Sequence, residues 1–178
     1  VYARSKAEGE RIVLDARNQG LQTAVVRLSN VYGCTKDHAD RVIPSFARAA
    51  FEGLTLRVDG SNHTFDFTHV DDVVRGITAL IEVLNSGAQP LPPVHLVSGY
   101  PTSLGELAAL CRRLANSASL VTEAAPRSYD VAQFYGDPTL AQALLGWSSE
   151  ISLEAGLRRL INDFRQELTL QNMAEAAA

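Results

Sequence analysis

The sequence has few cysteines and no long apolar run, and both observations limit the classes of protein to which it can belong. Its two cysteines, Cys34 and Cys111, lie far apart and match no metal-binding or redox spacing. We interpret both as reduced thiols that serve as small buried hydrophobes. No apolar run reaches the roughly 18 residues of a membrane-spanning helix, and no signal peptide opens the chain. The sequence therefore predicts a cytoplasmic protein with no membrane partner.

Positively charged residues are also fewer than negatively charged ones. The chain has 16 Lys and Arg against 20 Asp and Glu, which gives a net charge of -4, whereas nucleic-acid-binding proteins usually carry a basic stripe. The four histidines show no mutual metal-ligand spacing: His38, His63, His69 and His95. We expect neither a nucleic-acid partner nor a metal site.

What is present is an ordinary globular composition with alternating elements. The 178 residues, 46% hydrophobic, suffice for one sizeable core. Helical spacing predicts helices over these ranges: 2–18, 41–52, 70–84, 103–116, 138–145 and 152–168. Short β-branched or apolar runs predict strands over these: 22–30, 54–58, 64–69, 94–97 and 120–123. The alternation predicts an α/β or α+β class, and residues 171–178 are expected to form a frayed tail. Since nothing precedes the first helix to cap it, we also expect the chain to be part of a longer protein.

A tyrosine and a lysine stand four residues apart at the start of the first predicted helix. Tyr2 and Lys6 therefore share one helix face. A nearby ammonium group stabilises a phenolate relative to the phenol, so the pair could act as a general acid–base near neutral pH. By itself this spacing is equally typical of an exposed helix face.

The context of the pair strengthens the catalytic interpretation. Tyr-x-x-x-Lys, followed by Arg27-Leu-Ser-Asn30 and Val31-Tyr-Gly33, resembles the extended short-chain dehydrogenase/reductase family, the NAD-dependent epimerases and dehydratases of nucleotide sugars. Further family-like segments follow in the same order: Val-Ile-Pro at 42–44, Asp-Gly-Ser at 59–61, Phe-Asp-Phe-Thr-His-Val-Asp-Asp at 65–72, 94–99, 102–107, Arg127 with Asp130, Asp137-Pro138, and Leu-Gly-Trp at 145–147.

The resemblance implies a fold. Residues 1–34 would be the C-terminal remnant of a doubly wound Rossmann domain that binds a dinucleotide. Residues 35–170 would be mainly a smaller, mixed α+β substrate-binding lobe, with some elements returning to the Rossmann core. The family's glycine-rich phosphate loop does not occur in the sequence, so we expect most contacts to NAD or NADP to come from a segment outside this chain and the chain alone to be inactive.

The resemblance also implies roles for individual residues. Tyr2 would exchange a proton with a sugar hydroxyl, and Lys6 would bind the nicotinamide ribose; both are thus candidate catalytic and cofactor-binding residues. The candidate substrate-binding residues are Asn30, Arg41, Val42, Phe65 and Arg127, of which Arg127 would pair with the substrate diphosphate, because a guanidinium engages phosphate oxygens bidentately. The helix of Tyr2 and Lys6 would pack against its copy in a homodimer.

Two departures leave alternatives open. Cys34 stands where proline is usual, a mild change. Phe65 stands where many members carry arginine, so that contact is missing or supplied by Arg57 or His63. The main hypothesis is epimerisation or dehydration of a nucleotide sugar through a transient keto intermediate. The alternatives are a dehydrogenase or reductase of a small or steroid-like alcohol, and a truncated, non-catalytic binding or assembly module.

Three conspicuous residues have ordinary structural interpretations. Asp71 and Asp72 stand at a predicted helix start, where carboxylates cap the helix and complement its dipole. Trp147 follows a Leu-Gly pair and is expected to anchor the core.

Overall fold

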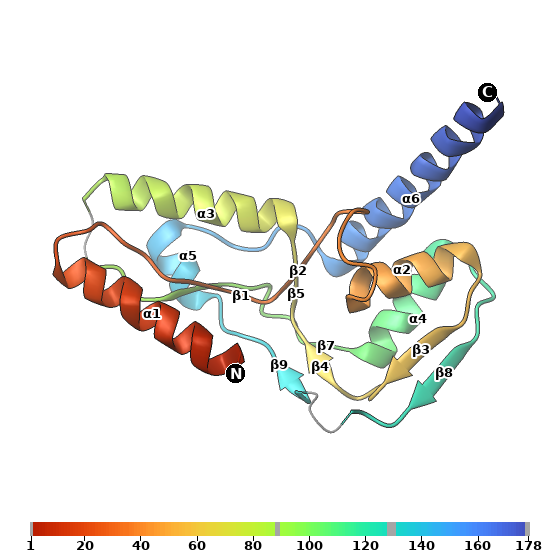
Figure 1. Cartoon of the computed structure of the whole chain (residues 1–178), viewed down its shortest axis with the longest axis horizontal. Coiled ribbons are helices and arrows are strands. Elements are labelled where there is room, and N and C mark those ends of the chain that lie inside the picture. The colour runs from red at the N-terminus through yellow and green to blue at the C-terminus, as the bar shows by residue number, and fades with distance from the viewer. Residues whose placement is uncertain (1, 88–89, 128–130, 177–178) are drawn as a thin grey trace.

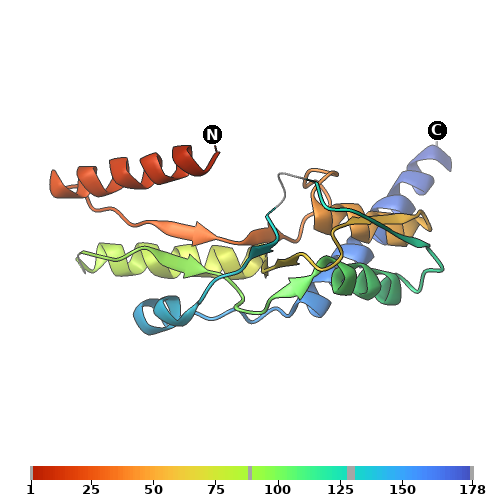
Figure 2. The same cartoon turned by 90° about the horizontal axis from the view of Figure 1, so that it is seen from below.

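Two groups of elements lie side by side along the long axis of the computed structural model, which describes residues 2–87, 90–127 and 131–176 (Figures 1 and 2). The first group contains these elements: α1 (Tyr2–Asn18), β1 (Val26–Leu28), α3 (Val70–Asn85), β6 (Val94–Leu96) and α5 (Thr139–Leu145). β1 and β6 pair in parallel. α1 lies on one side of this pair and α5 on the other (Figure 2). Asp130 of the predicted motifs lies outside the described residues.

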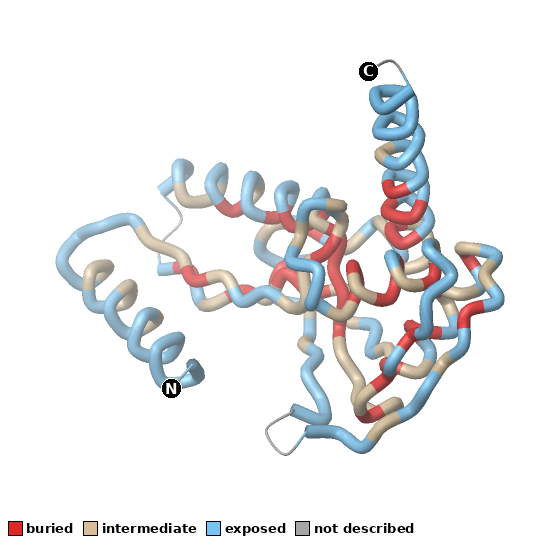
Figure 3. Tube along the Cα trace, turned by 45° about the vertical axis from the view of Figure 1, so that its right-hand side comes forward, coloured by how far each residue is buried: buried red, intermediate tan, exposed pale blue. Residues whose placement is uncertain are grey.

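α1 forms as predicted because it is rich in strong helix formers, yet it is held only loosely. None of its residues, all of which the structure describes, is buried. It is tied to β1 and to the loop before that strand by polar contacts: Arg27 pairs with Glu10 at 2.7 Å, and Arg17 donates to the carbonyl oxygen of Thr23 at 2.9 Å. Figure 3 shows α1 without a buried residue along its whole length.

The second group is built around a larger core. It contains these elements: α2 (Val42–Glu52), β3 (Leu56–Asp59), β4 (Thr64–Phe65), β7 (Thr102–Ser103), α4 (Leu104–Ala115), β8 (Val121–Ala124), β9 (Gln133–Phe134) and α6 (Leu153–Ala176). β3 pairs in parallel with β8, and β4 lies between antiparallel β7 and parallel β9. The apolar faces of α2, α4 and α6 pack together against β3.

A fourth parallel pair joins the two groups. β2 (Asn30–Tyr32) pairs with β5 (Phe67–His69), so that Tyr32 lies opposite His69. The strands predicted over 22–30 and 64–69 are each interrupted, at Ser29 and at Asp66. At both points the chain leaves one sheet and joins another, which local residue patterns do not encode.

The last helix is longer than predicted. α6 continues to Ala176, so the expectation of a frayed tail from Gln171 was wrong as far as Ala176, and residues 177–178 lie outside the described part. The segment 171–176 is rich in Gln, Met, Ala and Glu, which favour helix even where no residue is buried. Figure 1 shows this end of α6 extending away from the rest of the fold.

The start of α3 differs from the expectation of capping by its aspartates. Asp71 and Asp72 do lie in the first turn, but the cap is the side chain of His69, whose Nδ1 accepts from the amide of Asp71 at 3.2 Å. Asp72 is fully buried and binds the segment that precedes α6. The indole of Trp147 is buried and donates to the carbonyl oxygen of Asp72 at 2.8 Å, which confirms Trp147 as a core anchor.

Two features are absent from the described residues. Among them, no helix combines the length and the apolar character needed to cross a bilayer. The same residues contain no cluster of three or more His, Cys, Asp or Glu side chains able to hold a metal ion.

Candidate functional site

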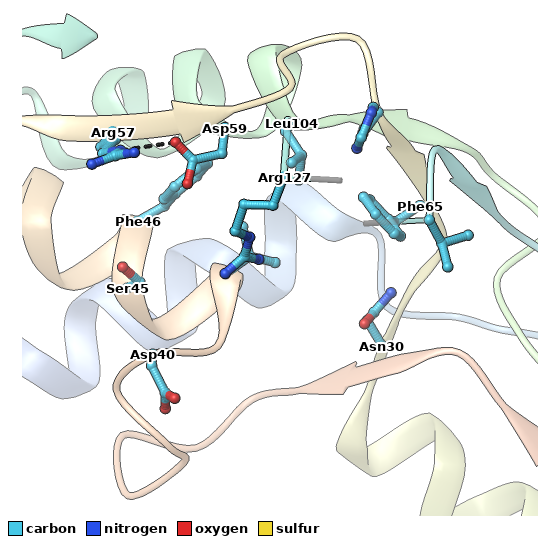
Figure 4. A pocket seen from close by; sticks show the side chains of 12 residues that line it. Asn30, Asp40, Ser45, Phe46, Arg57, Asp59, Phe65, Leu104 and Arg127 are labelled. Carbon is cyan, nitrogen blue, oxygen red and sulfur yellow. Dashed lines mark hydrogen bonds and ion pairs between the residues drawn. The ribbon is translucent and has the colours of Figure 1, made fainter. Parts of the chain in front are cut away.

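A cavity of about 470 Å³ opens between α2, β3, β4 and the segment that follows β8. Twelve residues line it (Figure 4): Asn30, Asp40, Val42, Ser45, Phe46, Arg57, Asp59, His63, Phe65, Leu104, Arg127 and Val131. Four of the five predicted substrate-binding residues meet here although they come from four separate segments. The fifth, Arg41, does not line this cavity.

Asn30 enters the cavity from the junction between the two groups. It begins β2, and both its backbone amide and its side-chain Nδ2 donate to the carbonyl oxygen of Asp66, each at 3.2 Å. One amide hydrogen and the Oδ1 acceptor of the side chain remain for other partners. Asn30 therefore presents a donor and an acceptor in a fixed orientation.

His63 and Phe65 reach the cavity from β4 and the turn before it. The amide of His63 donates to the carbonyl oxygen of Gly60 at 2.8 Å, which closes the turn. Gly60 has φ +73°, and a Cβ there would stand 3.0 Å from the Cβ of Pro126, the residue before Arg127. The left-handed backbone and the close approach both require glycine. This turn thus brings the His63 side and the Arg127 side of the cavity together.

The charged groups of the lining are mixed in sign. Arg57 donates from Nε to Asp59 at 2.8 Å on the rim. Figure 4 shows the Arg127 side chain extending into the cavity, with Phe65 and Asn30 to one side and Ser45 to the other. Two guanidinium groups beside an aromatic ring suit a ligand that carries both an anionic group and a flat or apolar part.

The first turn of α2 adds to the attraction for an anion. Val42 and Ser45 line the cavity, and the first turn contains no acidic residue. Arg41, at the N-cap, makes no side-chain capping hydrogen bond. The positive end of the helix dipole therefore lies beside the cavity, where Asp40 of the preceding loop also contributes to the lining.

Arg41 belongs to a smaller neighbouring cavity of about 150 Å³, which it shares with Asn30 and Val42. Its guanidinium pairs with Asp37 at 3.5 Å. The backbone of Arg41 is extended, with φ -72° and ψ 142°, so its side chain does not continue the helical face on which Val42 and Ser45 lie.

Tyr2 and Lys6 lie away from the cavity lining. They occupy one face of α1, as their spacing predicts, with the Lys6 ammonium 5.5 Å from the centroid of the Tyr2 ring. Tyr2 is 75% exposed. The end of α1 that carries both residues points toward the middle of the molecule, where β2 and β5 lie (Figure 1).

Several lining residues were not predicted from the sequence. Ser45 and Phe46 follow Val42 by three and four residues on α2, and this helical spacing is a signal that could have identified them. Asp40, Asp59, Leu104 and Val131 come from separate loops and elements. Asp59 and Leu104 lie within family-like segments, but no pattern in the sequence assigned any of the four to a binding site.

Sequence comparison relates the chain to enzymes of known activity. Residues 1–92 match the model of the NAD dependent epimerase/dehydratase family. UDP-glucuronic acid decarboxylase 1 of Xenopus tropicalis is 32% identical over 87% of this chain and 36% of its own length. UDP-glucuronate 4-epimerase of Thermodesulfobacterium geofontis is 30% identical over 85% of this chain and 46% of its own. The chain thus spans between about a third and a half of these relatives.

Structural comparison agrees. UDP-glucose 4-epimerase of Thermotoga maritima, solved with UDP-glucose, superposes with a TM-score of 0.80 at 28% identity, over 89% of this chain and 51% of the other. UDP-glucuronic acid 4-epimerase of Bacillus cereus gives 0.81 at 20% identity over 93% and 52%, a likeness of fold alone. These neighbours confirm the α/β class and its relation to the Rossmann-type enzymes. Together with the match over residues 1–92, they show that the chain belongs to the NAD dependent epimerase/dehydratase family.

Proposed function

We propose that the protein modifies a nucleotide sugar by epimerisation or dehydration through a transient keto intermediate, and that this chain supplies the substrate cavity and the Tyr2–Lys6 pair. The observation that carries the proposal is the convergence of Asn30, Val42, Phe65 and Arg127 on one cavity. The relatives of this chain bear the names of UDP-sugar decarboxylases and epimerases.

The cavity lining suits the parts of a nucleoside diphosphate sugar. Arg127 and the first turn of α2 supply positive charge for the diphosphate, and Arg57, although paired with Asp59, adds further guanidinium donors. Phe46 and Phe65 supply apolar surface for the base and for the carbon face of a sugar. A steroid-like alcohol, which Phe65 alone would allow, matches this charged lining less well.

The Tyr2–Lys6 pair suits the redox part of the reaction. NAD or NADP supplies the acceptor for the hydride that leaves the sugar carbon. Tyr2 takes the proton of the hydroxyl on the same carbon and later returns it. The Lys6 ammonium stabilises the phenolate during this exchange. Lys6 also has free donors for the hydroxyls of a cofactor ribose, since it stands on an exposed helix face.

These roles assign different parts of the chain to two domains of the proposed enzyme. We place residues 1–34 with the dinucleotide-binding domain and residues 35–170 mainly with the substrate-binding lobe, to which α3, β6 and α5 are exceptions because they pack with β1. A homodimer through α1 is part of the proposal, supported by the absence of buried residues along that helix.

Calorimetric titration of the chain with UDP-glucose and UDP-glucuronic acid tests the proposed substrate class. We expect Arg127→Gln to weaken binding roughly 10- to 100-fold, the usual effect of losing a hydrogen bond to a charged group. Arg165→Gln is the matched control, because Arg165 lies on α6 and bonds to Asn162. Absence of binding, or equal affinities for the two variants, would refute the proposal.

A further inference from the structure

Asp66 carries a buried carboxylate whose hydrogen-bonding capacity is filled by neutral donors. The residue is fully buried between β4 and β5. Its Oδ1 accepts from the amide of Ser98 at 2.9 Å and from Oγ1 of Thr68 at 3.1 Å. Its Oδ2 accepts from the amide of Gly99 at 2.7 Å and from Oγ of Ser98 at 3.0 Å. Four donors from two segments thus fix the position of this side chain.

The backbone of the same residue holds the cavity residue Asn30. The carbonyl oxygen of Asp66 accepts both the backbone amide and the Nδ2 group of Asn30. Its amide donates to the carbonyl oxygen of Phe134 at 3.0 Å. Thr68 extends the network, since its Oγ1 also lies 2.9 Å from Oγ of Ser29. Asp66 therefore joins the start of β2, the loop after β6 and the end of β9.

We propose that Asp66 is a positioning residue of the candidate site, whose carboxylate fixes the peptide that orients the side-chain amide of Asn30 toward a nucleotide-sugar substrate. The part that concerns the substrate rests on the function proposed above. Asp66 does not line the cavity. Its effect on binding passes through Asn30: one amide hydrogen is committed to Asp66, which aligns the remaining hydrogen and Oδ1 before a ligand arrives. Such preorganisation lowers the entropy that binding must otherwise lose.

Asp72 provides a comparison carboxylate within the same chain, although its Oδ1 also pairs with Arg75 at 2.5 Å. It is also fully buried, and its Oδ2 accepts from Oγ of Ser149, the amide of Glu150 and the amide of Ile151 at 3.0, 3.2 and 2.9 Å. These three partners line a different cavity, of about 370 Å³, whose lining shares no residue with that of the Asn30 cavity. Loss of either carboxylate disturbs a buried network, but only Asp66 contacts Asn30.

The test compares Asp66→Asn with Asp72→Asn in two measurements. The Asp66→Asn amide turns donors toward Gly99 or Ser98, where the carboxylate accepted, so the local backbone must move. The first measurement is the ¹⁵N–¹H spectrum of the Asn30 side-chain amide, identified by its loss in Asn30→Ala. The second is the affinity for UDP-glucose at a temperature where every variant is folded. Ser98→Ala, which removes one donor and keeps the carboxylate, is the milder variant if Asp66→Asn does not fold.

We expect Asp66→Asn to shift the Asn30 amide signals and to weaken UDP-glucose binding roughly tenfold, the effect of about one lost hydrogen bond. Ser98→Ala should shift the same signals less. Asp72→Asn should lower the melting temperature while leaving both the Asn30 signals and the affinity unchanged. Unchanged Asn30 signals in Asp66→Asn and Ser98→Ala would overturn the proposal. If the wild-type chain binds no UDP-glucose, the proposed function fails, and the Asn30 signals alone decide the role of Asp66.

Discussion

At the scale of single residues, the absence of a side chain at Gly156 allows the first turn of α6 to pack directly against Tyr32. Both residues are buried, and a Cβ at Gly156 would stand 2.1 Å from the Tyr32 hydroxyl. Gly156→Ala must displace the ring or the helix, so we expect it to lower the free energy of unfolding by about 1–3 kcal/mol.

Urea denaturation measures this effect, with Gly9→Ala as the control. Gly9 lies on the exposed surface of α1, where a Cβ meets no atom within 4 Å. There alanine should stabilise the chain by up to about 1 kcal/mol, because glycine is the weaker helix former. Equal unfolding free energies for the two variants would show that a Cβ at position 156 does not disturb the contact with Tyr32.

His69 makes stability depend on pH near neutrality. Burial lowers the pKa of His69, and the nearby Asp71 only partly opposes this. As the pH falls, the unfolded chain is therefore protonated on this residue near its ordinary pKa of about 6.5, whereas the folded chain is protonated only at a lower pH. Stability is fully present above that pH and falls as the pH drops below it, toward the lowered pKa of the folded state.

His69→Asn removes this dependence while retaining an acceptor for the Asp71 amide. We expect the free energy of unfolding of the wild type to decrease from pH 7.5 to pH 5.5, and that of His69→Asn to decrease less. The measurement is a series of urea titrations across this range. Parallel curves for the two proteins would assign the pH dependence to other groups.

At the scale of elements, local chemistry predicted the helices well. The helix predicted over 103–116 begins at a capping box: Ser103 Oγ accepts from the Glu106 amide, and Glu106 accepts from the Ser103 amide. The interruptions at Ser29 and Asp66 escaped prediction, because each marks a change of sheet partner decided by residues distant in sequence. The cavity is non-local in the same sense. Asn30, Val42, Phe65 and Arg127 were identified through resemblance, whereas Asp59 and Leu104 were found only from the fold.

The outer part of α6 should be dispensable for stability. Beyond Glu167, every described residue of the helix is exposed, whereas Ile161 and Phe164 belong to the core. Ending the chain after Leu170 should change the free energy of unfolding by no more than about 0.5 kcal/mol, as for other exposed positions. Ending it after Leu160 removes two buried side chains, and should cost several kcal/mol or prevent folding. Thermal unfolding of the two truncated chains, followed by circular dichroism, distinguishes these outcomes.

At the scale of the whole molecule, the helix that carries Tyr2 and Lys6 is the most weakly held part of the first group. It contributes no buried residue, whereas α3 buries Val73 and Leu80. Local opening should therefore expose the amides of α1 at a lower free energy than those of α3.

Hydrogen exchange followed by mass spectrometry tests this order. We expect α1 to exchange before α3, and Glu10→Gln, which weakens the pair with Arg27, to speed exchange in α1 alone. Added salt should act in the same direction, because the pair is partly exposed and therefore screened. Exchange of α1 and α3 at a common rate would mean that the first group opens as one unit.

The lining of the Asn30 cavity extends in sequence from Asn30 to Val131. A ligand seated there acts as a reversible cross-link between chain segments that are far apart in the unfolded protein. Occupancy and folding then form a single linked equilibrium: once the free ligand exceeds its dissociation constant, each further tenfold rise in its concentration adds about 1.4 kcal/mol to the free energy of unfolding. The thermal midpoint of the chain therefore rises with ligand concentration, and this rise requires binding but no catalysis.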